Sequence, residues 1–344
     1  MYPIIRREAF SETTFLWEVL APDVARAAQP GHFVMLRLHE GGERIPLTVA
    51  DFDRDKGTIT MVIQALGKTT LAMRDHYKQG DSIADFVGPL GLPQHVSPVG
   101  HVVLVGGGLG VAPVYPQLRA FKEAGNRTTG IIGFRNKDLV FWEEQFARYC
   151  DNLIVCTDDG SYGRPGFVNA ALQHVLDTDR PDLVVAIGPL PMMNACVETS
   201  RPSGVKTMVS LNAIMVDGTG MCGSCRVTVG SEIKFACVDG PDFDGHQVDF
   251  KELLLRQKRF KGEEAAASSD YAHVCNVEKV LFEQGKTNYK KYKDLAPHAT
   301  KMPERDPLER SRNFKEVNLG YSMADALNEA ERCIMCSKPA CIEG

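Results

Sequence analysis

His101-Val-Val-Leu-Val-Gly-Gly-Gly-Leu-Gly-Val-Ala-Pro113 is the stretch that decides the fold. An apolar run ends in glycines, and a helix-like segment from Pro113 to Ala124 follows. A short apolar run bounded by turn residues is typical of a strand buried in a parallel sheet. The stretch therefore predicts the strand–turn–helix unit of a parallel α/β domain.

The glycines of this turn also predict a nucleotide site. They allow the backbone to approach a ligand, and the helix N-terminus offers free N–H groups and a positive dipole end to a pyrophosphate. The turn departs from G-x-G-x-x-G, because Val111 stands at the third glycine, so a tight turn that only packs the helix on the sheet is the alternative. The predicted nucleotide contacts are Gly107, Gly108, Gly110 and Pro113.

Two further apolar runs, residues 152–157 and 182–188, repeat the signature of a buried strand. Strands that alternate with helix-like segments predict a parallel α/β sheet over residues 99–210. Asp158 and Asp159 follow the first of these runs, and ligands of open α/β sheets bind at the carboxyl ends of the strands. The two acids are candidates to bind a ribose, with ordinary turn chemistry as the alternative.

Residues 1–98 predict a small β-barrel. Residues 15–20, 32–38, 45–50 and 58–65 are rich in β-branched and aromatic residues and are separated by turn residues. Short strands at such even spacing are typical of a barrel.

Two segments of this part are candidates for binding phosphate and flavin. Arg44 can neutralise a phosphate bidentately, and Thr48, two residues past Pro46, can make a polar contact to the edge of a flavin ring. Gly67-Lys-Thr69-Thr70 is like half of a P-loop, but a strand precedes it where the upstream glycine would stand, which excludes an ATPase. Its N–H groups and hydroxyls can still hold another phosphate.

Asp217-Gly-Thr-Gly-Met-Cys222-Gly-Ser-Cys225, with Cys237 twelve residues on, is the strongest metal signal of the chain. The spacing follows the plant-type 2Fe–2S pattern C-x4-C-x2-C…C, with Asp217 in the place of the first cysteine. A carboxylate oxygen can supply the fourth ligand, although it is a harder donor than a thiolate. The alternatives are a turn role for Asp217 with the fourth ligand elsewhere, or a zinc ion. The predicted cluster module spans residues 211–260 and ends in an amphipathic helix.

The remaining chain predicts a connector over residues 261–300 and a cysteine-bearing segment over residues 301–344. Residues 281–315 are basic; a solvated linker is the first reading and a docking surface for an acidic redox partner the second. Close spacing near the C-terminus suggests a second cluster site without a fourth ligand of its own, and a zinc site or free thiols are the alternatives. Its cysteines are Cys333, Cys336 and Cys341.

Bulk composition narrows the function classes. A chain of 344 residues can form two or three domains. The net charge of −5 argues against nucleic acid as the main partner. No apolar run reaches the ~18 residues of a membrane helix, and the N-terminus has no apolar signal core, so we expect a cytoplasmic protein. The ten cysteines stand in C-x2-C pairs or singly, which favours metal ligation over disulfides.

Together these motifs resemble the ferredoxin–NADP reductase superfamily over residues 1–260. The resemblance implies a β-barrel FAD domain, an α/β NAD(H) domain, a small 2Fe–2S module and a helical C-terminal extension. It assigns FAD to the residues Arg44, Pro46, Leu47, Thr48, Gly67, Thr69, Thr70 and Gly88. It assigns NAD(H) to the turn of residues 106–113 and to Asp158, Asp159 and Gly188. Superfamily members often carry Cys-Gly-Pro where this chain has Ile187-Gly188-Pro189, so no thiol is implied there.

Within the superfamily, two families of subunits are similar to this chain. One is the electron-transfer subunit of dihydroorotate dehydrogenase, in which the resemblance implies a cluster site of four cysteines. The other is the small subunit of NADH-dependent reduced ferredoxin:NADP oxidoreductase. An aspartate at the first ligand position, as in Asp217, makes this chain more similar to the second family. Residues 301–344 are similar to the start of that enzyme's large subunit and to the glutamate synthase small subunit, in which one more cysteine completes a run that feeds 4Fe–4S clusters. We therefore expect a truncated or split product.

The resemblance implies an oxidoreductase subunit that passes electrons between NAD(H), FAD and a 2Fe–2S cluster. It would be the NAD(H) arm of an electron-bifurcating enzyme, with a large flavin/iron–sulfur subunit as partner and ferredoxin and NADP(H) as indirect partners. Hydride transfer needs no side-chain acid or base, so no catalytic residue is predicted. The alternatives are an electron-transfer subunit of a dihydroorotate dehydrogenase, sulfide dehydrogenase or hydrogenase, and a docking module that binds FAD and a cluster without turnover.

Overall fold

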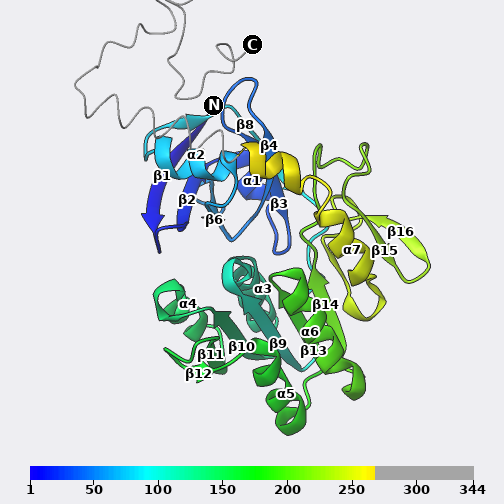
Figure 1. The fold of residues 1–344 in the computed structure, drawn as a ribbon. Coiled ribbons are helices and arrows are strands. Elements are labelled where there is room, and N and C mark those ends of the chain that lie inside the picture. Colours follow the sequence, from blue (N-terminus) through cyan, green and yellow to red (C-terminus); the bar gives the residue numbers. More distant parts are fainter. Residues whose placement is uncertain (268–344) are drawn as a thin grey trace, which may run out of the picture. The chain divides into compact units, whose positions relative to one another are not determined.

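The computed structural model describes residues 1–267, in which a β-rich part is followed by an α/β part and a cysteine-bearing part (Figure 1). Most of the predicted connector and the whole segment with Cys333, Cys336 and Cys341 lie outside the described residues. No helix of the described residues is long and apolar enough to cross a membrane.

The β-rich part consists of two antiparallel sheets. The five-stranded sheet has the order β5-β6-β2-β1-β7 and the three-stranded sheet the order β4-β3-β8. Their strands are β1 (Tyr2–Ala9), β2 (Thr14–Leu20), β3 (Phe33–Arg37), β4 (Arg44–Thr48), β5 (Asp51–Asp53), β6 (Thr58–Gln64), β7 (Ser82–Ile83) and β8 (Asp85–Leu90). Two helices, α1 (Pro22–Ala27) and α2 (Lys68–His76), belong to the same part. The hydrogen bonds define two sheets, and closure into a barrel stays a prediction.

Alternate side chains of strand β2 are buried in two different hydrophobic cores. Phe15 and Trp17 of β2 are buried in the same cluster as Val34 of β3, so the two sheets share one core. Leu16, between these β2 residues, belongs instead to the core of the α/β part. Successive side chains of a strand point to opposite faces, so the β-rich part packs on the α/β part through its second face.

The α/β part is a sheet with the order β12-β11-β10-β9-β13-β14-β17. All pairs are parallel except that of β14 with β17. The strands are β9 (His101–Gly107), β10 (Arg127–Phe134), β11 (Asn152–Thr157), β12 (Arg164–Pro165), β13 (Leu183–Ile187), β14 (Lys206–Ser210) and β17 (Asp242–Asp244). The helices are α3 (Val111–Glu123), α4 (Glu143–Ala147), α5 (Val168–Asp179) and α6 (Leu190–Ser200).

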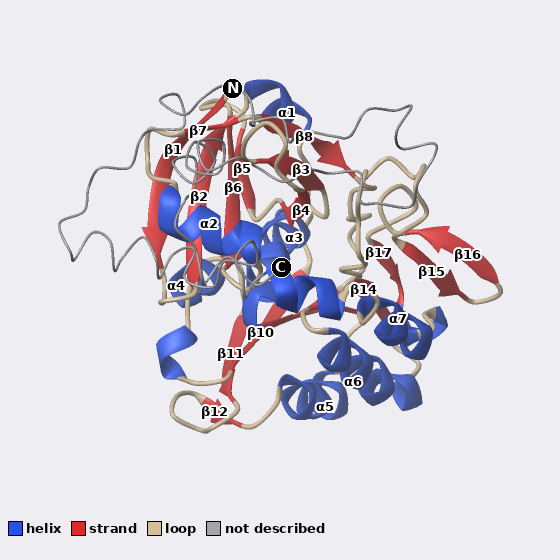
Figure 2. Cartoon of the chain, turned by 45° about the horizontal axis from the view of Figure 1, so that its top comes forward, coloured by secondary structure: helices blue, strands red, loops and turns tan. Residues whose placement is uncertain are grey.

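Both faces of this sheet are covered, which explains its continuous apolar strands. Val102 and Leu104 of β9 are buried with α3, whereas Val103 and Val105 are buried with α5 and α6. Figure 2 shows α5 and α6 together, away from α3. The predicted parallel sheet is confirmed, and the predicted helix of residues 113–124 is observed as α3.

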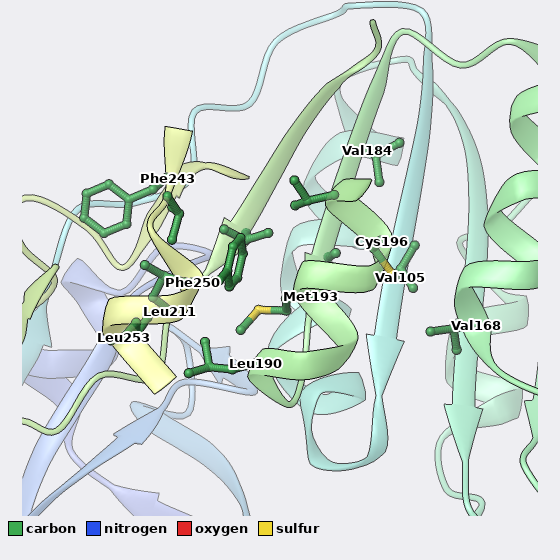
Figure 3. Close-up of a cluster of buried hydrophobic side chains, with 14 of the residues drawn as sticks. Val105, Val168, Val184, Leu190, Met193, Cys196, Leu211, Phe243, Phe250 and Leu253 are labelled. Atoms are coloured by element: carbon green, nitrogen blue, oxygen red, sulfur yellow. The ribbon is translucent and has the colours of Figure 1, made fainter. Parts of the chain in front are cut away.

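The cysteine-bearing part is built onto the edge of the α/β sheet. Its hairpin comprises β15 (Arg226–Val229) and β16 (Glu232–Phe235), and its helix α7 (Phe250–Gln257) is shorter than the amphipathic segment that the sequence predicts over residues 246–261. Figure 3 shows Leu211 and Phe250 on the side of the α6 residues Leu190 and Met193, and Phe243 belongs to the same buried cluster. Strand β17 lies antiparallel to β14, so this part continues the sheet.

Candidate functional site

The four predicted cluster ligands form two close pairs. Cys222 Sγ lies 3.4 Å from Asp217 Oδ1, and Cys225 Sγ lies 3.2 Å from Cys237 Sγ. Cys225 and Cys237 are buried, whereas Cys222 is exposed. Among residues 1–267, no three His, Cys, Asp or Glu side chains gather around the position of a single metal ion. Two pairs fit a two-iron cluster, because two bridging sulfides leave each tetrahedral iron two positions for protein ligands.

Backbone and side-chain donors hold Asp217 as a carboxylate. The amide of Thr219 donates to Oδ1 at 3.1 Å and that of Cys222 donates to Oδ2 at 3.1 Å. The Thr219 amide and the contacts of Cys222 lower the pKa of Asp217. Burial raises the pKa of Cys237 to about 12, and the neighbouring thiol of Cys225 adds to this rise. The Asp217 contacts are those of an Asx-type turn, so they are compatible both with a ligand role and with the turn alternative.

The cluster loop packs against the β-rich part through a glycine. Gly218 has a φ of +75°, and a Cβ at this position would lie 2.7 Å from Cγ of Met35. Met35 lies on β3, opposite Pro46 of the predicted flavin segment on β4. Neighbouring strands are about 4.8 Å apart, so the cluster loop and the flavin segment are separated by one strand of the sheet.

The predicted flavin residues lie at neighbouring strand and helix ends. Thr69 donates a hydrogen bond to Glu43, which places the start of α2 beside the start of β4 and Arg44. Thr70 Oγ1 accepts from the amide of Gly67 at 3.1 Å, and a Cβ on Gly67 would meet no atom within 4 Å. Arg44 is exposed and has no ion-pair partner among the described residues. An unpaired guanidinium next to first-turn N–H groups fits a phosphate.

Residues 88–91 connect the flavin part to the cluster part. Strand β8 ends at Leu90, and the amide of Leu92 donates to the carbonyl of Gly240 at 2.6 Å. Gly91 has a φ of +82°, and a Cβ there would lie 3.0 Å from the same carbonyl oxygen. The segment with Gly88 therefore lies between β3 and Gly240 of the cluster module.

The glycine turn after β9 lies at the point where the strand order reverses. Strand β9 has β10 on one side and β13 on the other, and crevices at such a point bind ligands in open α/β sheets. A Cβ on Gly110 would lie 2.2 Å from the carbonyl oxygen of Ile187, and a Cβ on Gly107 would lie 2.1 Å from Sδ of Met192. A Cβ on Gly188 would lie 2.9 Å from the same sulfur atom. The structure thus brings Gly107, Gly108, Gly110, Pro113 and Gly188 to one edge of the sheet.

Asp158 and Asp159 lie at that edge, two strands away, after β11. Their amides donate to the carbonyls of Phe134 and Arg135, at 2.9 and 3.2 Å. The carboxylate of Asp159 is used within the turn, since Oδ1 accepts from the hydroxyl of Ser161 at 2.6 Å. Burial raises the pKa of Asp158, and its carboxylate takes part in no hydrogen bond among residues 1–267. Of the two acids, Asp158 is the one free to bind a ribose hydroxyl.

Two polar contacts between the parts have no signal in the sequence. Arg119 of α3 pairs with Asp51 of β5, with an N–O distance of 2.8 Å. On another face of α3, Gln117 Nε2 donates to Oδ2 of Asp242 on β17 at 3.2 Å. Asp242 Oδ1 is buried without a partner, and burial raises the pKa of this carboxyl to about 7. Asp242 stands at the end of a short strand, and the sequence contains no pattern that predicts the burial of its side chain between the two parts.

Family models match two segments of the chain. The model described as the iron–sulfur cluster binding domain of dihydroorotate dehydrogenase B matches residues 212–249. The model described as dihydropyrimidine dehydrogenase domain II, 4Fe-4S cluster, matches residues 310–344. The first match covers all four predicted cluster ligands, and the second covers Cys333, Cys336 and Cys341.

Curated relatives cover most of the described chain. A homologue of the electron transfer subunit of dihydroorotate dehydrogenase B (NAD(+)) from Thermotoga maritima is 48% identical over 263 residues, which is 76% of this chain and 92% of that protein. The electron transfer subunit of dihydroorotate dehydrogenase B from Shouchella clausii is 36% identical over 231 residues, which is 64% of this chain and 86% of that protein.

Solved structures agree with this relationship. A chain from the structure of the NADH-dependent reduced ferredoxin-NADP oxidoreductase, solved for insights into flavin-based electron bifurcation, is 45% identical with a TM-score of 0.76. The match covers 79% of this chain and 98% of that chain. The ferredoxin reductase in carbazole 1,9a-dioxygenase shares the fold, at 17% identity, a TM-score of 0.51 and coverage of 59% of this chain and 65% of that one.

Proposed function

We infer the function of this chain from its family, for it belongs to the electron-transfer subunits of dihydroorotate dehydrogenase B and their homologues. It is a subunit of a flavin and iron–sulfur oxidoreductase, and a partner subunit completes the enzyme. We propose that it passes electrons between NAD(H), FAD and a 2Fe–2S cluster. The observation that carries this proposal is the contact of Gly218 with Met35, which joins the cluster loop to the strand beside the flavin segment.

Each cofactor has residues that suit it. The glycine turn around Gly110 would hold the pyrophosphate of NAD(H), and Asp158 would accept hydrogen bonds from a ribose. Arg44 and the residues of the 67–70 turn would hold the phosphates of FAD, with Thr48 near the ring. A bound flavin supplies the step from the two-electron chemistry of nicotinamide to the one-electron chemistry of a cluster. Asp217, Cys222, Cys225 and Cys237 would ligate the irons.

Asp158 supports a preference for NADH over NADPH. A carboxylate accepts hydrogen bonds from the ribose hydroxyls of NADH, whereas it repels the 2′-phosphate of NADPH. Burial raises the pKa of Asp158 from its ordinary value, but its side chain is exposed enough to meet a ligand.

We propose further that the chain is the NAD(H) arm of an electron-bifurcating NADH-dependent ferredoxin:NADP oxidoreductase. The 45% identity to a chain of that enzyme over nearly its full length supports this assembly. Its partner would be a large flavin/iron–sulfur subunit, and ferredoxin and NADP(H) would react there. The match of residues 310–344 to a 4Fe-4S model supports a second cluster held by Cys333, Cys336 and Cys341 together with a ligand from elsewhere.

A dihydroorotate dehydrogenase electron-transfer subunit is the second candidate, and the names of the curated relatives favour it. Both candidates share the path from NAD(H) to the cluster and differ in the partner. Co-purification of the full-length chain from its natural source separates them, because the large subunit that accompanies it identifies the enzyme.

An anaerobic titration of the full chain, loaded with FAD and its cluster, tests the shared path. We expect NADH to bleach both the flavin and the iron–sulfur absorption, and NADPH to do so more weakly. Bleaching by NADPH alone would make the chain an NADP reductase, and no bleaching by either nucleotide would leave a docking module. Arg44→Ala should lose FAD, while Arg26→Ala, which removes an exposed arginine on α1, should retain it.

A further inference from the structure

Three arginines surround one small cavity beside the cluster loop. Arg226 follows the ligand Cys225 in the sequence, and Arg256 and Arg259 lie at the end of α7 and just beyond it. Figure 1 shows α7 beside the hairpin of β15 and β16, and all three arginines line the cavity between them. None of them has an ion-pair partner among residues 1–267. Three positive charges without an ion-pair partner therefore lie next to the predicted cluster ligands, where they raise the local electrostatic potential.

Arg256 is the arginine that contacts the loop. Its Nη2 donates to the carbonyl oxygen of Ser224 at 3.4 Å, within the segment that joins Cys222 to Cys225. Its Nε is buried and has no hydrogen-bond partner in the described part of the chain. Burial and then the like charges of Arg226 and Arg259 lower the pKa of Arg256. A guanidinium nevertheless keeps its proton at neutral pH, so a fixed positive charge faces the loop.

The cavity itself is too small to be an anion site. Its volume is about 10 Å³. That is close to the least space that one water molecule needs, so it cannot enclose a phosphate or a carboxylate ligand. Glu252, one turn before Arg256, opposes part of the positive charge but forms no ion pair with it, because its carboxylate accepts from the hydroxyl of Thr228. The charge of Arg256, which contacts the carbonyl of Ser224, is therefore not cancelled by an ion pair.

We propose that Arg256, aided by Arg226 and Arg259, raises the reduction potential of the centre held by Asp217, Cys222, Cys225 and Cys237. This inference rests on the proposed function, since it takes the centre to be a 2Fe–2S cluster. A cluster with three thiolates and one carboxylate carries two negative charges when oxidised and three when it has accepted one electron. No proton accompanies this electron, so a nearby positive charge favours the reduced state. The electron comes from the reduced flavin of the proposed path.

The test is the midpoint potential of the cluster in the full chain, measured by an anaerobic redox titration followed by electron paramagnetic resonance. We expect Arg256→Gln to move the one-electron equilibrium about tenfold toward the oxidised cluster, which corresponds to about 59 mV. Arg256→Lys keeps the charge and should stay near the wild-type potential. Lys251→Gln removes an exposed charge from the same helix and is the matched control, with no shift expected.

The outcomes separate this inference from the proposed function. An unchanged potential in Arg256→Gln overturns the inference, and so does an equal fall in Arg256→Gln and Arg256→Lys, which would assign the effect to contact geometry. If Arg256→Gln loses the cluster, the variants Arg226→Gln and Arg259→Gln test the inference, because both side chains are exposed and their replacement should not disturb folding. A lowered cluster potential in these variants supports the inference, and an unchanged potential overturns it. A wild-type chain without a cluster signal overturns the proposed function as well.

Discussion

Gly218 of the cluster loop lies so close to Met35 of strand β3 that a Cβ on residue 218 would be 2.7 Å from Met35 Cγ. We expect Gly218→Ala to push the cluster loop away from the flavin part. We also expect it to lower the free energy of unfolding by about 1 kcal/mol or more, because Ala is strained at a φ of +75°. Rapid mixing with NADH should show slower reduction of the cluster at an unchanged rate of flavin reduction.

Gly230→Ala is the matched control for this change. Gly230 has a φ of +62° in the hairpin of the same module, and a Cβ there would meet only the side-chain oxygen of Gln247, at 3.2 Å. The variant imposes similar backbone strain without touching β3. Equal slowing of cluster reduction in both variants would refute a path through the Gly218 contact.

The iron content of Asp217 variants tests whether Asp217 is a cluster ligand. We expect Asp217→Ala to lower the iron and sulfide content, because the cluster loses one of four ligands, and Asp217→Cys to retain the cluster with an altered potential. Asp239→Ala serves as control, since it removes another carboxylate of the module that accepts a backbone hydrogen bond. Wild-type iron content and spectrum in Asp217→Ala would leave Asp217 only its turn role.

Asp158 should control the choice of nucleotide. We expect Asp158→Asn to weaken NADH binding about tenfold, as for the loss of a charge-assisted hydrogen bond, and to narrow the difference between NADH and NADPH. Binding isotherms for the two nucleotides measure both effects. Asp177→Asn, at the far end of α5, is the control and should bind like wild type. An unaltered ratio of the two affinities in Asp158→Asn would exclude the ribose contact.

The buried carboxyl of Asp242 should make stability depend on pH. Its pKa is about 7 in the folded chain against 3.8 ordinarily, so between these values the folded state binds a proton that the unfolded state has lost. The free energy of unfolding should therefore fall as pH rises from about 4 to about 7, with a slope of at most about 1.4 kcal/mol per pH unit. Asp242→Asn should flatten this slope.

Chemical unfolding of both chains across that pH range measures the effect. Asp244→Asn, two residues along the same strand, keeps the buried carboxyl and should keep the wild-type slope. A slope that Asp242→Asn leaves intact would mean that another group carries the pH dependence.

The sequence predicts the elements and motifs that neighbouring residues form, and it does not predict contacts between residues that are far apart in the chain. The apolar run before Gly106 marked β9 and its turn, because a buried parallel strand must be apolar on both faces. Helix α2 was missed, since its start, Gly67-Lys-Thr-Thr, reads equally well as a phosphate loop. The ligand set of Asp217 and the three cysteines was predicted by spacing alone, and the structure brings these residues together in pairs.

The contacts between the parts could not be predicted in this way. Strand β17 pairs with β14, although 31 residues separate them in the sequence. Three residues are too few to show a periodicity, so the sequence does not predict that β14 is the neighbour of β17. The burial of Asp242 and the approach of Gly218 to Met35 depend on how separate parts pack, so neither follows from propensity or pattern. The approach of Gly218 to Met35 is also the contact that carries the proposed function.

Anaerobic rapid mixing of the oxidised full chain, loaded with FAD and cluster, with NADH tests the central claim most directly. The proposed path predicts that the flavin absorption bleaches first and the iron–sulfur absorption follows in a separate, slower phase. A cluster that stays oxidised while the flavin is fully reduced, or that is reduced before the flavin, would contradict it.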